Sequence, residues 1–239
     1  MRTLETALDA HLAYDALIAG CSERVAGGLM LRSPRFPASW DLNQVVLEPG
    51  ADAAAVARAL ELAEERLAGA DYRRVTVFGP AEEVAAPPGW EKAVLLVMLL
   101  PEGDAPSWPP SVRVVDPAEL DEPRLEVWRA LAGPERAPQL AEMQRAFATG
   151  PGARCLAIYA GAGDLAGWCQ VHAGGIDDVW IVERHRGRGL GKTLVRGAMA
   201  AGGWYLNCDV NDPRPQGLYR KLGFRDAGVI VQLTRRVRG

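Results

Sequence analysis

The chain has few of the residues that build metal and redox centres. Its 239 residues include only three histidines and four cysteines, namely His11, His172, His185, Cys21, Cys155, Cys169 and Cys208. No two cysteines stand at the CxxC spacing, and no histidine stands at metal-ligand spacing from another. The sequence therefore predicts no metal site, and it favours buried free thiols.

Long hydrophobic runs are also missing. The longest, residues 93–100, has the length of a β-strand and is far shorter than the roughly 20 residues that cross a bilayer. Near the N-terminus, Glu5 stands where a secretory signal would place its apolar core. We expect a soluble cytoplasmic protein that does not enter a membrane.

Positive charge is scarce in the first part of the chain. Residues 1–110 carry 9 basic and 16 acidic side chains, whereas residues 111–239 carry 18 basic and 14 acidic ones. A nucleic-acid-binding protein is normally more basic, and it interleaves aromatic residues with its positive charges. The distribution instead favours a local anion site in the second part.

A proline-rich segment divides the chain. Residues 101–110 hold four prolines, lack hydrophobic periodicity and follow a strand-like run, which is typical of a linker. The predicted domains are therefore residues 1–100 and residues 111–239.

The pattern after the linker predicts helices, then a meander of strands, then alternating helices and strands. Glycine clusters at 161–163 and 174–175 suit hairpin turns within the meander. The predicted strands are 111–115, 155–159, 165–172, 176–182, 205–210 and 229–233, and the predicted helices lie in 117–131, 139–147, 190–201 and 216–222. This order is typical of a mixed α/β fold rather than a regular parallel one.

The first part repeats the later portion of this order. It predicts a strand at 40–47, a helix at 52–67 and strands at 74–78 and 93–100. The repetition indicates an internal duplication. The sequence identity between the two parts is slight, so two unrelated α/β segments that share an order are the alternative.

The loop Arg186-Gly187-Arg188-Gly189-Leu190-Gly191 stands between a predicted strand and a predicted helix. A helix start binds phosphate when its backbone N–H groups converge, side-chain bulk is small and the helix dipole lies behind them. The alternating glycines meet these requirements. Neighbouring arginines and Lys192 add positive charge that suits a pyrophosphate.

Two other glycine motifs fail at this loop. A Walker loop needs a leading glycine where Arg186 stands, although Gly191-Lys192-Thr193 would complete its end. A dinucleotide loop needs GxGxxG, but the glycines here are spaced GxGxG. A flexible basic turn with no ligand is the remaining alternative.

Two motifs in the second part resemble those of one family. Residues 181–191 look like the acyl-CoA loop of the GCN5-related N-acetyltransferase (GNAT) family, with Glu183 where many members have proline. Residues 211–224, which include Leu218-Tyr219 and Gly223-Phe224, resemble its N-x-x-A-x-x-L-Y-x-x-x-G-F motif. The resemblance covers about residues 111–239, and the two-domain layout resembles tandem members whose first copy is degenerate.

The resemblance implies a tandem GNAT fold of mixed α/β class, each half being a mostly antiparallel twisted sheet flanked by helices. It also implies an acyltransferase enzyme, an N-acetyltransferase that moves an acetyl or other acyl group from acetyl-CoA to a primary amine. The acceptor would be a small molecule or a peptide. Transfer would be direct, in a ternary complex, because no Ser-His or Cys-His arrangement announces a nucleophile.

The family's cofactor contacts fall on three segments of this chain. The strand before the loop would pair with the pantetheine arm, the loop would cradle the pyrophosphate, and an asparagine further on would contact the cofactor. The matching residues are Val179, Trp180, Ile181, Arg186, Gly187, Arg188, Gly189, Leu190, Gly191, Lys192 and Asn211. Counting back from Tyr219 places Asp212 rather than Asn211 at the asparagine position, so both residues stay candidates.

Three residues match the family's catalytic positions. Tyr219 matches a tyrosine that protonates the leaving thiolate, and the alternative is a core aromatic residue. Many members have a carboxylate base on the strand before the loop, so Asp177 and Asp178 are candidates. Since side chains alternate along a strand, we expect these two to point to opposite faces, with one of them in the cleft.

His172 and His185 are weaker candidates for the base. His185 stands within the loop, where a surface position is more typical. The first part has no arginine-glycine loop: Glu48-Pro49-Gly50-Ala51-Asp52-Ala53 stands there instead, and Asp52 suits a helix N-cap. We expect this half not to bind acyl-CoA and to complete the acceptor cleft or the fold.

Two other functions stay open on the sequence alone. An acyl-CoA-binding or sensory module without turnover would explain the degenerate half, and a nucleic-acid binder would use the arginines at 184–188. The acceptor and the oligomeric state are not encoded in any motif of the chain.

Overall fold

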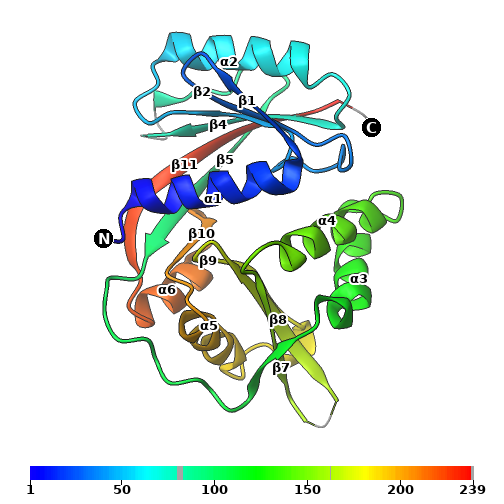
Figure 1. Cartoon of the computed structure of the whole chain (residues 1–239), viewed down its shortest axis with the longest axis vertical. Helices are drawn as coiled ribbons and strands as arrows, with labels where there is room; N and C mark the ends of the chain where they lie inside the picture. The colour runs from blue at the N-terminus through cyan, green and yellow to red at the C-terminus, as the bar shows by residue number, and fades with distance from the viewer. Residues whose placement is uncertain (80–82, 162, 238–239) are drawn as a thin grey trace.

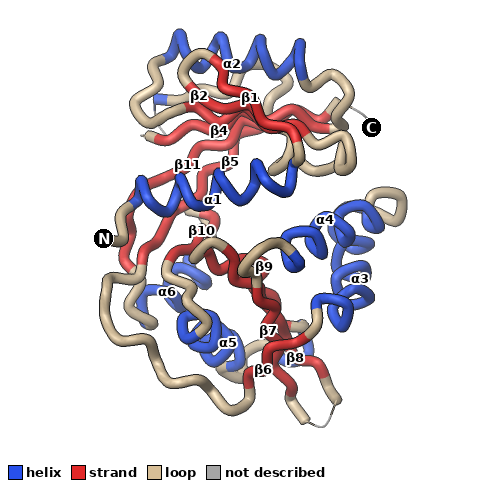
Figure 2. The backbone as a smooth tube through the Cα atoms, viewed as in Figure 1, coloured by secondary structure: helices blue, strands red, loops and turns tan. Residues whose placement is uncertain are grey.

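The computed structural model describes residues 1–79, 83–161 and 163–237. Within these ranges the strands form one eleven-stranded sheet in the order β1-β2-β3-β4-β11-β5-β10-β9-β8-β7-β6. Figure 1 shows this sheet running through both halves of the molecule, and Figure 2 shows helices along both of its sides. Neighbouring strands are mostly antiparallel, whereas β3–β4 and β9–β10 are parallel.

The first half starts with a helix and an antiparallel meander of three strands. A second helix then leads to a strand parallel to the third, and a long strand ends the half. These elements are α1 (Leu4–Ala19), β1 (Cys21–Val25), β2 (Gly28–Arg32), β3 (Gln44–Leu47), α2 (Ala53–Arg66), β4 (Tyr72–Phe78) and β5 (Glu91–Leu99).

The second half adds an edge strand and two helices before its own meander. A helix, a parallel strand, a further helix and the last strand follow, as in the first half. These elements are β6 (Val112–Val115), η2 (Pro117–Leu120), α3 (Asp121–Ala132), α4 (Ala137–Thr149), β7 (Arg154–Tyr159), β8 (Leu165–His172), β9 (Gly175–Ile181), η3 (Glu183–His185), α5 (Leu190–Ala200), β10 (Tyr205–Asp209), α6 (Pro213–Lys221) and β11 (Arg225–Arg236).

The two halves exchange their last strands. β11 lies between β4 and β5 of the first half and pairs antiparallel with both. β5 in turn pairs antiparallel with β10 of the second half. The strand order is therefore symmetric about the β11–β5 pair, with β1 to β4 on one side matched by β7 to β10 on the other.

Each parallel pair separates soon after it begins. β3 and β4 pair only from Gln44↔Arg74 to Val46↔Thr76, and β9 pairs with β10 only at Gly175↔Tyr205. Beyond these points no pairing between the two strands of each pair is found among the described residues, and we call this unpaired stretch the gap. The gap in the second half lies directly before the glycine loop.

The two faces of the sheet carry different helices. Helices α2, α5 and α6 bury apolar side chains on one face, including Leu194 and Val195 of α5. Helices α1 and α4 meet on the other face, where Tyr14 of α1 donates a hydrogen bond to the carbonyl oxygen of Phe147 at 2.6 Å. This second face therefore joins the two halves (Figure 1).

The structure confirms the mixed, mostly antiparallel α/β fold and the predicted elements after residue 52, with boundary shifts of a few residues. It also contains α1, β1 and β2, which no sequence pattern predicted, and it shortens the strand predicted at 40–47 to β3. Residues 101–110 contain no helix or strand. Ala162, in the first glycine cluster, lies outside the described residues. No helix among the described residues has the length and apolar character that crossing a bilayer needs.

Candidate active site

The glycine loop leaves the start of α5 open. Gly187 and Gly189 have φ values of 75° and 78°, which other residues rarely adopt, and no atom of the described residues lies within 4 Å of where their side chains would be. Gly189 is the N-cap of α5, and no side chain in the described part of the chain caps this helix end. The first N–H groups of a helix have no partner within it, so this end can receive an anion.

Some basic residues of the loop form ion pairs within the protein, and others do not. Arg184 donates to Asp164 at 2.8 Å, and His185 Nε2 lies 3.1 Å from the other oxygen of the same carboxylate. Arg186 lies over the ring of Trp180 at 5.5 Å. Within the described residues, Arg186, Arg188 and Lys192 form no ion pair.

The expectation of a surface position for His185 is wrong. The residue is buried, because its ring is enclosed between the Asp164 carboxylate and Arg188, whose guanidinium lies 3.1 Å from Nδ1. His185 therefore holds the loop in shape rather than facing a ligand.

The corresponding helix start of the first half is closed. Asp52 caps α2 by accepting a hydrogen bond from the N–H of Ala55 at 2.7 Å, as the sequence predicts. A groove of about 1140 Å³ lies beside it, between α1 and the ends of β3 and β4. Its one arginine, Arg24, is paired with Glu48. This half thus keeps a groove but lacks the open, basic helix start.

A β-bulge shapes the strand before the loop. Between the pairs Gln170↔Asp177 and Trp168↔Trp180, β9 has one residue more than β8, and Asp178 adopts a φ of 53°. Asp178 binds side chains of α3 and α4, and Asp177 lines a cavity walled by α4. Both therefore lie on the same face, and the expectation of opposite faces is wrong because the bulge breaks the alternation.

Asp178 is held by three donors. Its carboxylate accepts hydrogen bonds from Arg124 Nε and Trp168 Nε1, both at 3.1 Å, and from Gln144 Nε2 at 3.0 Å. Burial raises the pKa of Asp178 to about 6, against the opposing effect of Arg124. The side chain of Arg124 is fully buried. These contacts make Asp178 part of the framework behind the site.

Asp177 instead faces a cavity of about 290 Å³ between the two halves. Helices α1, α3 and α4 and strands from both halves form its walls. The cavity is lined by His11, Asp15, Trp40, Asp41, Arg74, Leu95, Trp128, Met143, Gln144, Phe147, Gln170, Asp177, Asn207 and Gln232. Most of these side chains are polar or aromatic, and three are carboxylates.

Histidines accompany two of the carboxylates. His172 Nε2 lies 3.5 Å from Asp177 Oδ2, and His11 Nε2 lies 3.4 Å from Asp15 Oδ2. Burial would raise the pKa of Asp177, but the contact with His172 and the charge of His11 hold it below the usual value. For His11, burial would lower the pKa, yet Asp15, Asp177 and Asp41 together raise it.

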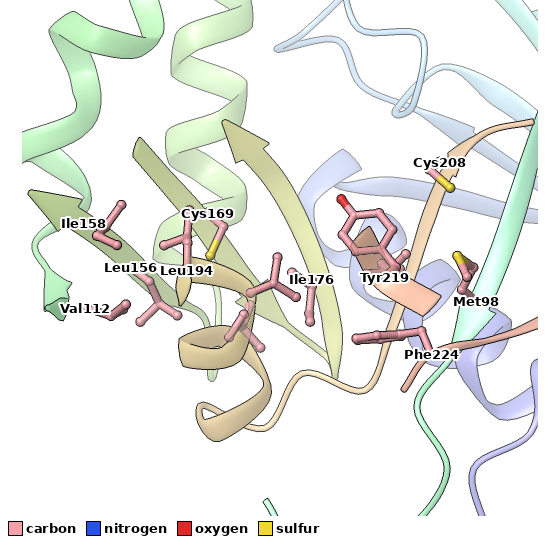
Figure 3. Packing of buried hydrophobic residues seen from close by; sticks show 14 of the residues in the cluster. Met98, Val112, Leu156, Ile158, Cys169, Ile176, Leu194, Cys208, Tyr219 and Phe224 are labelled. Atoms are coloured by element: carbon pink, nitrogen blue, oxygen red, sulfur yellow. The ribbon is translucent and has the colours of Figure 1, made fainter. Parts of the chain in front are cut away.

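Tyr219 lies on the other side of the gap, in α6. Figure 3 shows its ring between β9, which carries Ile176, and Cys208 of β10. The residue is 7% exposed, and burial raises the pKa of its hydroxyl well above the usual value. The ring also packs against Phe224, so it belongs to the core as well.

The remaining candidates lie along the gap and at the start of α6. Val179, Trp180 and Ile181 follow the point where β9 leaves β10, so their backbone edge has no neighbouring strand among the described residues. Asn211 is exposed, whereas Asp212 is the N-cap of α6 and accepts from the N–H of Arg214 at 3.0 Å. Asp212 therefore has a structural role, and Asn211 is the freer side chain.

Several cavity residues could not be predicted from the sequence, among them His11, Asp15, Asp41 and Arg74 of the first half. No local motif marks them, since they meet Asp177 only through the folded chain. Among the described residues, no three His, Cys, Asp or Glu side chains form a group arranged to hold a metal ion.

Comparisons with known proteins agree with this geometry. Residues 151–226, which include the meander, the glycine loop and α6, match the family model of the acetyltransferase (GNAT) domain. No curated protein matches the sequence. A functionally unknown conserved protein from Staphylococcus epidermidis has a similar fold, with a TM-score of 0.66 at 14% identity over 90% of this chain and 93% of that chain.

Two further structures carry the family name. A GCN5-related N-acetyltransferase from Kribbella flavida has a TM-score of 0.59 at 21% identity and covers 96% of both chains. A tandem GNAT protein from the clavulanic acid biosynthesis pathway has a TM-score of 0.50 at 17% identity over 99% of this chain and 96% of that one. Residues 151–226 are therefore similar to the acetyltransferase (GNAT) domain, and the whole chain has a fold similar to that of these GNAT proteins.

Proposed function

We propose that this protein is an N-acetyltransferase that moves an acetyl group from acetyl-CoA directly to a primary amine. The observation that carries the proposal is the open, glycine-rich start of α5, which adjoins the gap between β9 and β10, with an acidic cavity on the far side of that gap. A donor bound on the loop would reach the acceptor through the gap.

The loop supplies the donor site. The N–H groups at residues 187–192 and the positive end of the α5 dipole would hold the pyrophosphate, with Arg186, Arg188 and Lys192 around it. The edge of β9 at residues 179–181, which has no neighbouring strand among the described residues, would bind the amides of the pantetheine arm. Asn211, exposed at the start of α6, would add a contact to the same arm.

The cavity supplies the acceptor site. Asp177 stays ionised, so its carboxylate would hold and orient the substrate ammonium while one proton of the ammonium leaves to water. The free amine would then attack the thioester carbonyl, forming the C–N bond as the C–S bond breaks. Tyr219, which stays protonated, would donate its proton to the departing thiolate, and the second proton of the nitrogen would return to Tyr219 through water.

The buried thiols favour direct transfer over an acyl-enzyme intermediate. Burial raises the pKa of the thiols of Cys155, Cys169 and Cys208, which disfavours the thiolate that a cysteine nucleophile requires. The first half, which contributes α1 and β4 to the cavity, would complete the acceptor site without binding acetyl-CoA itself. These roles correspond to the proposed division into a domain at 1–100, a linker at 101–110 and an acetyltransferase domain at 111–239.

Release of free CoA thiol from acetyl-CoA in the presence of a panel of primary amines tests the proposal. We expect release with at least one amine, and a fall in kcat of about a hundredfold in Tyr219→Phe because the proton donor is lost. Tyr159→Phe, which removes a hydroxyl on β7 outside the cavity, should keep normal turnover. Thermal stabilisation by acetyl-CoA without thiol release from any amine would show a binding module instead, and the proposed reaction would be wrong.

A further inference from the structure

Asp15 of α1 is a buried carboxylate in which one of the two oxygens has no hydrogen-bond partner among the described residues. Its side chain is 2% exposed, and Oδ1 has no hydrogen-bond partner among the described residues. Oδ2 has only the 3.4 Å contact with His11. An ionised carboxylate in such surroundings is unfavourable unless a cation or donor reaches it. Because Asp15 lines the cavity, a ligand there can supply the missing partner.

The protein's own nearby cation is already engaged elsewhere. Arg74 donates to Asp41 at 2.6 Å and to Thr234 at 3.1 Å, and its guanidinium lies over the Trp40 ring. The Arg74–Asp41 pair neutralises itself, whereas Asp15 and Asp177 form no ion pair with an arginine or lysine among the described residues. The cavity therefore offers two carboxylates, one from each half, to a ligand with two cationic nitrogens.

The two remaining carboxylates lie near each other in the cavity. Asp15 contacts His11 and Asp177 contacts His172, and the two imidazole rings are 6.4 Å apart between centroids. A volume of about 290 Å³ holds a small molecule. Since no group of described residues is arranged to hold a metal ion, an organic cation is the better match.

We propose that the acceptor is a short alkyl diamine, with one ammonium bound by Asp15 of the first half while the other nitrogen reacts beside Asp177. This inference rests on the proposed function and names the substrate class of that site. The first half would then select the substrate, and the second half would carry out the transfer.

The test compares diaminobutane with butylamine, which has the same carbon chain but a single nitrogen. We expect kcat/KM of the wild type to be at least about tenfold higher for diaminobutane, because only the diamine pairs with Asp15. In Asp15→Asn this ratio should fall to about one. Asp9→Asn, an exposed carboxylate on the same helix, should leave the ratio as in the wild type.

A second measurement tests diamine binding independently of acetyl transfer. Diaminobutane alone should raise the Tm of the wild type and raise it less in Asp15→Asn. Equal kcat/KM values for the two amines, or an equal Tm shift in both proteins, would overturn the diamine inference while leaving acetyl transfer intact. A diamine-dependent Tm shift that Asp15→Asn removes, with no thiol release from any amine, would support the diamine site and refute the proposed reaction.

Discussion

Adjacent aspartates on β9 have different surroundings and therefore different roles. Asp177 has a half-exposed side chain that faces the cavity, whereas Asp178 is enclosed by Arg124, Trp168 and Gln144. A carboxylate that already accepts three hydrogen bonds has little capacity left for a substrate. We therefore assign substrate contact to Asp177 and the positioning of β9 to Asp178.

Replacing Asp178 should destabilise the protein. In Asp178→Ala the buried Arg124 loses its carboxylate, and breaking such a pair typically lowers the free energy of unfolding by about 3–5 kcal/mol. Urea denaturation measures this loss. Asp177→Ala is the matched control, since it removes a half-exposed carboxylate one residue away.

We expect Asp177→Ala to lower the free energy of unfolding much less than Asp178→Ala does. It should also lower the turnover per folded molecule much more. Equal destabilisation by the two changes would contradict the division of roles.

The glycine loop and α5 act together as one element. Gly187 and Gly189 are required by their backbone angles, but Gly191 is not: a Cβ there would lie 3.6 Å from Ile181 and 3.7 Å from Leu218, which are ordinary contacts. The protein itself therefore has room for alanine at 191. A glycine that the fold does not require is consistent with close approach of a ligand.

Gly191→Ala should weaken acetyl-CoA binding without lowering the stability of the fold. We expect a Tm equal to the wild type or slightly higher, because alanine favours a helix over glycine by up to about 1 kcal/mol. Acetyl-CoA affinity, measured by calorimetry, should fall at least about tenfold, because the added methyl group would lie at the helix start where we propose that the pyrophosphate binds.

Gly69→Ala makes the same change after α2, where nothing lies within 4 Å, and should leave the affinity unchanged. An unchanged affinity in Gly191→Ala would show that the ligand does not approach the start of α5.

Elements with local sequence signals could be predicted, and the glycine loop with α5 is one of them. The strand, the glycine loop and the helix face at Leu194 and Ala198 are contiguous, so their pattern is complete within about twenty residues. The bulge at Asp178 could not be predicted, because nothing in the local sequence marks an extra residue in β9. Helix α1 was missed because its apolar side chains are not confined to one stripe. Leu4, Leu8 and Leu12 line the first-half groove while Tyr14 packs towards α4.

At the scale of the whole molecule, the exchange of β5 and β11 joins the two halves into one sheet. Leu233 of the second half's last strand is fully buried in the first half's core, together with Val45 and Val75. The pairing of residues so far apart in sequence has no local signal, so the exchange could not be read from the chain. The same holds for the cavity, whose acidic residues come from both halves.

We propose that each chain has one acyl-CoA site, at the start of α5. Calorimetric titration with acetyl-CoA measures the number of sites, with Arg186→Ala/Arg188→Ala as the variant and Arg24→Ala, in the first-half groove, as the control. We expect one site per chain, with affinity at least about tenfold weaker in the double variant because two charge-assisted contacts are lost, and unchanged in the control. Two sites per chain, or full affinity in the double variant, would show that the acyl-CoA site is not confined to the start of α5.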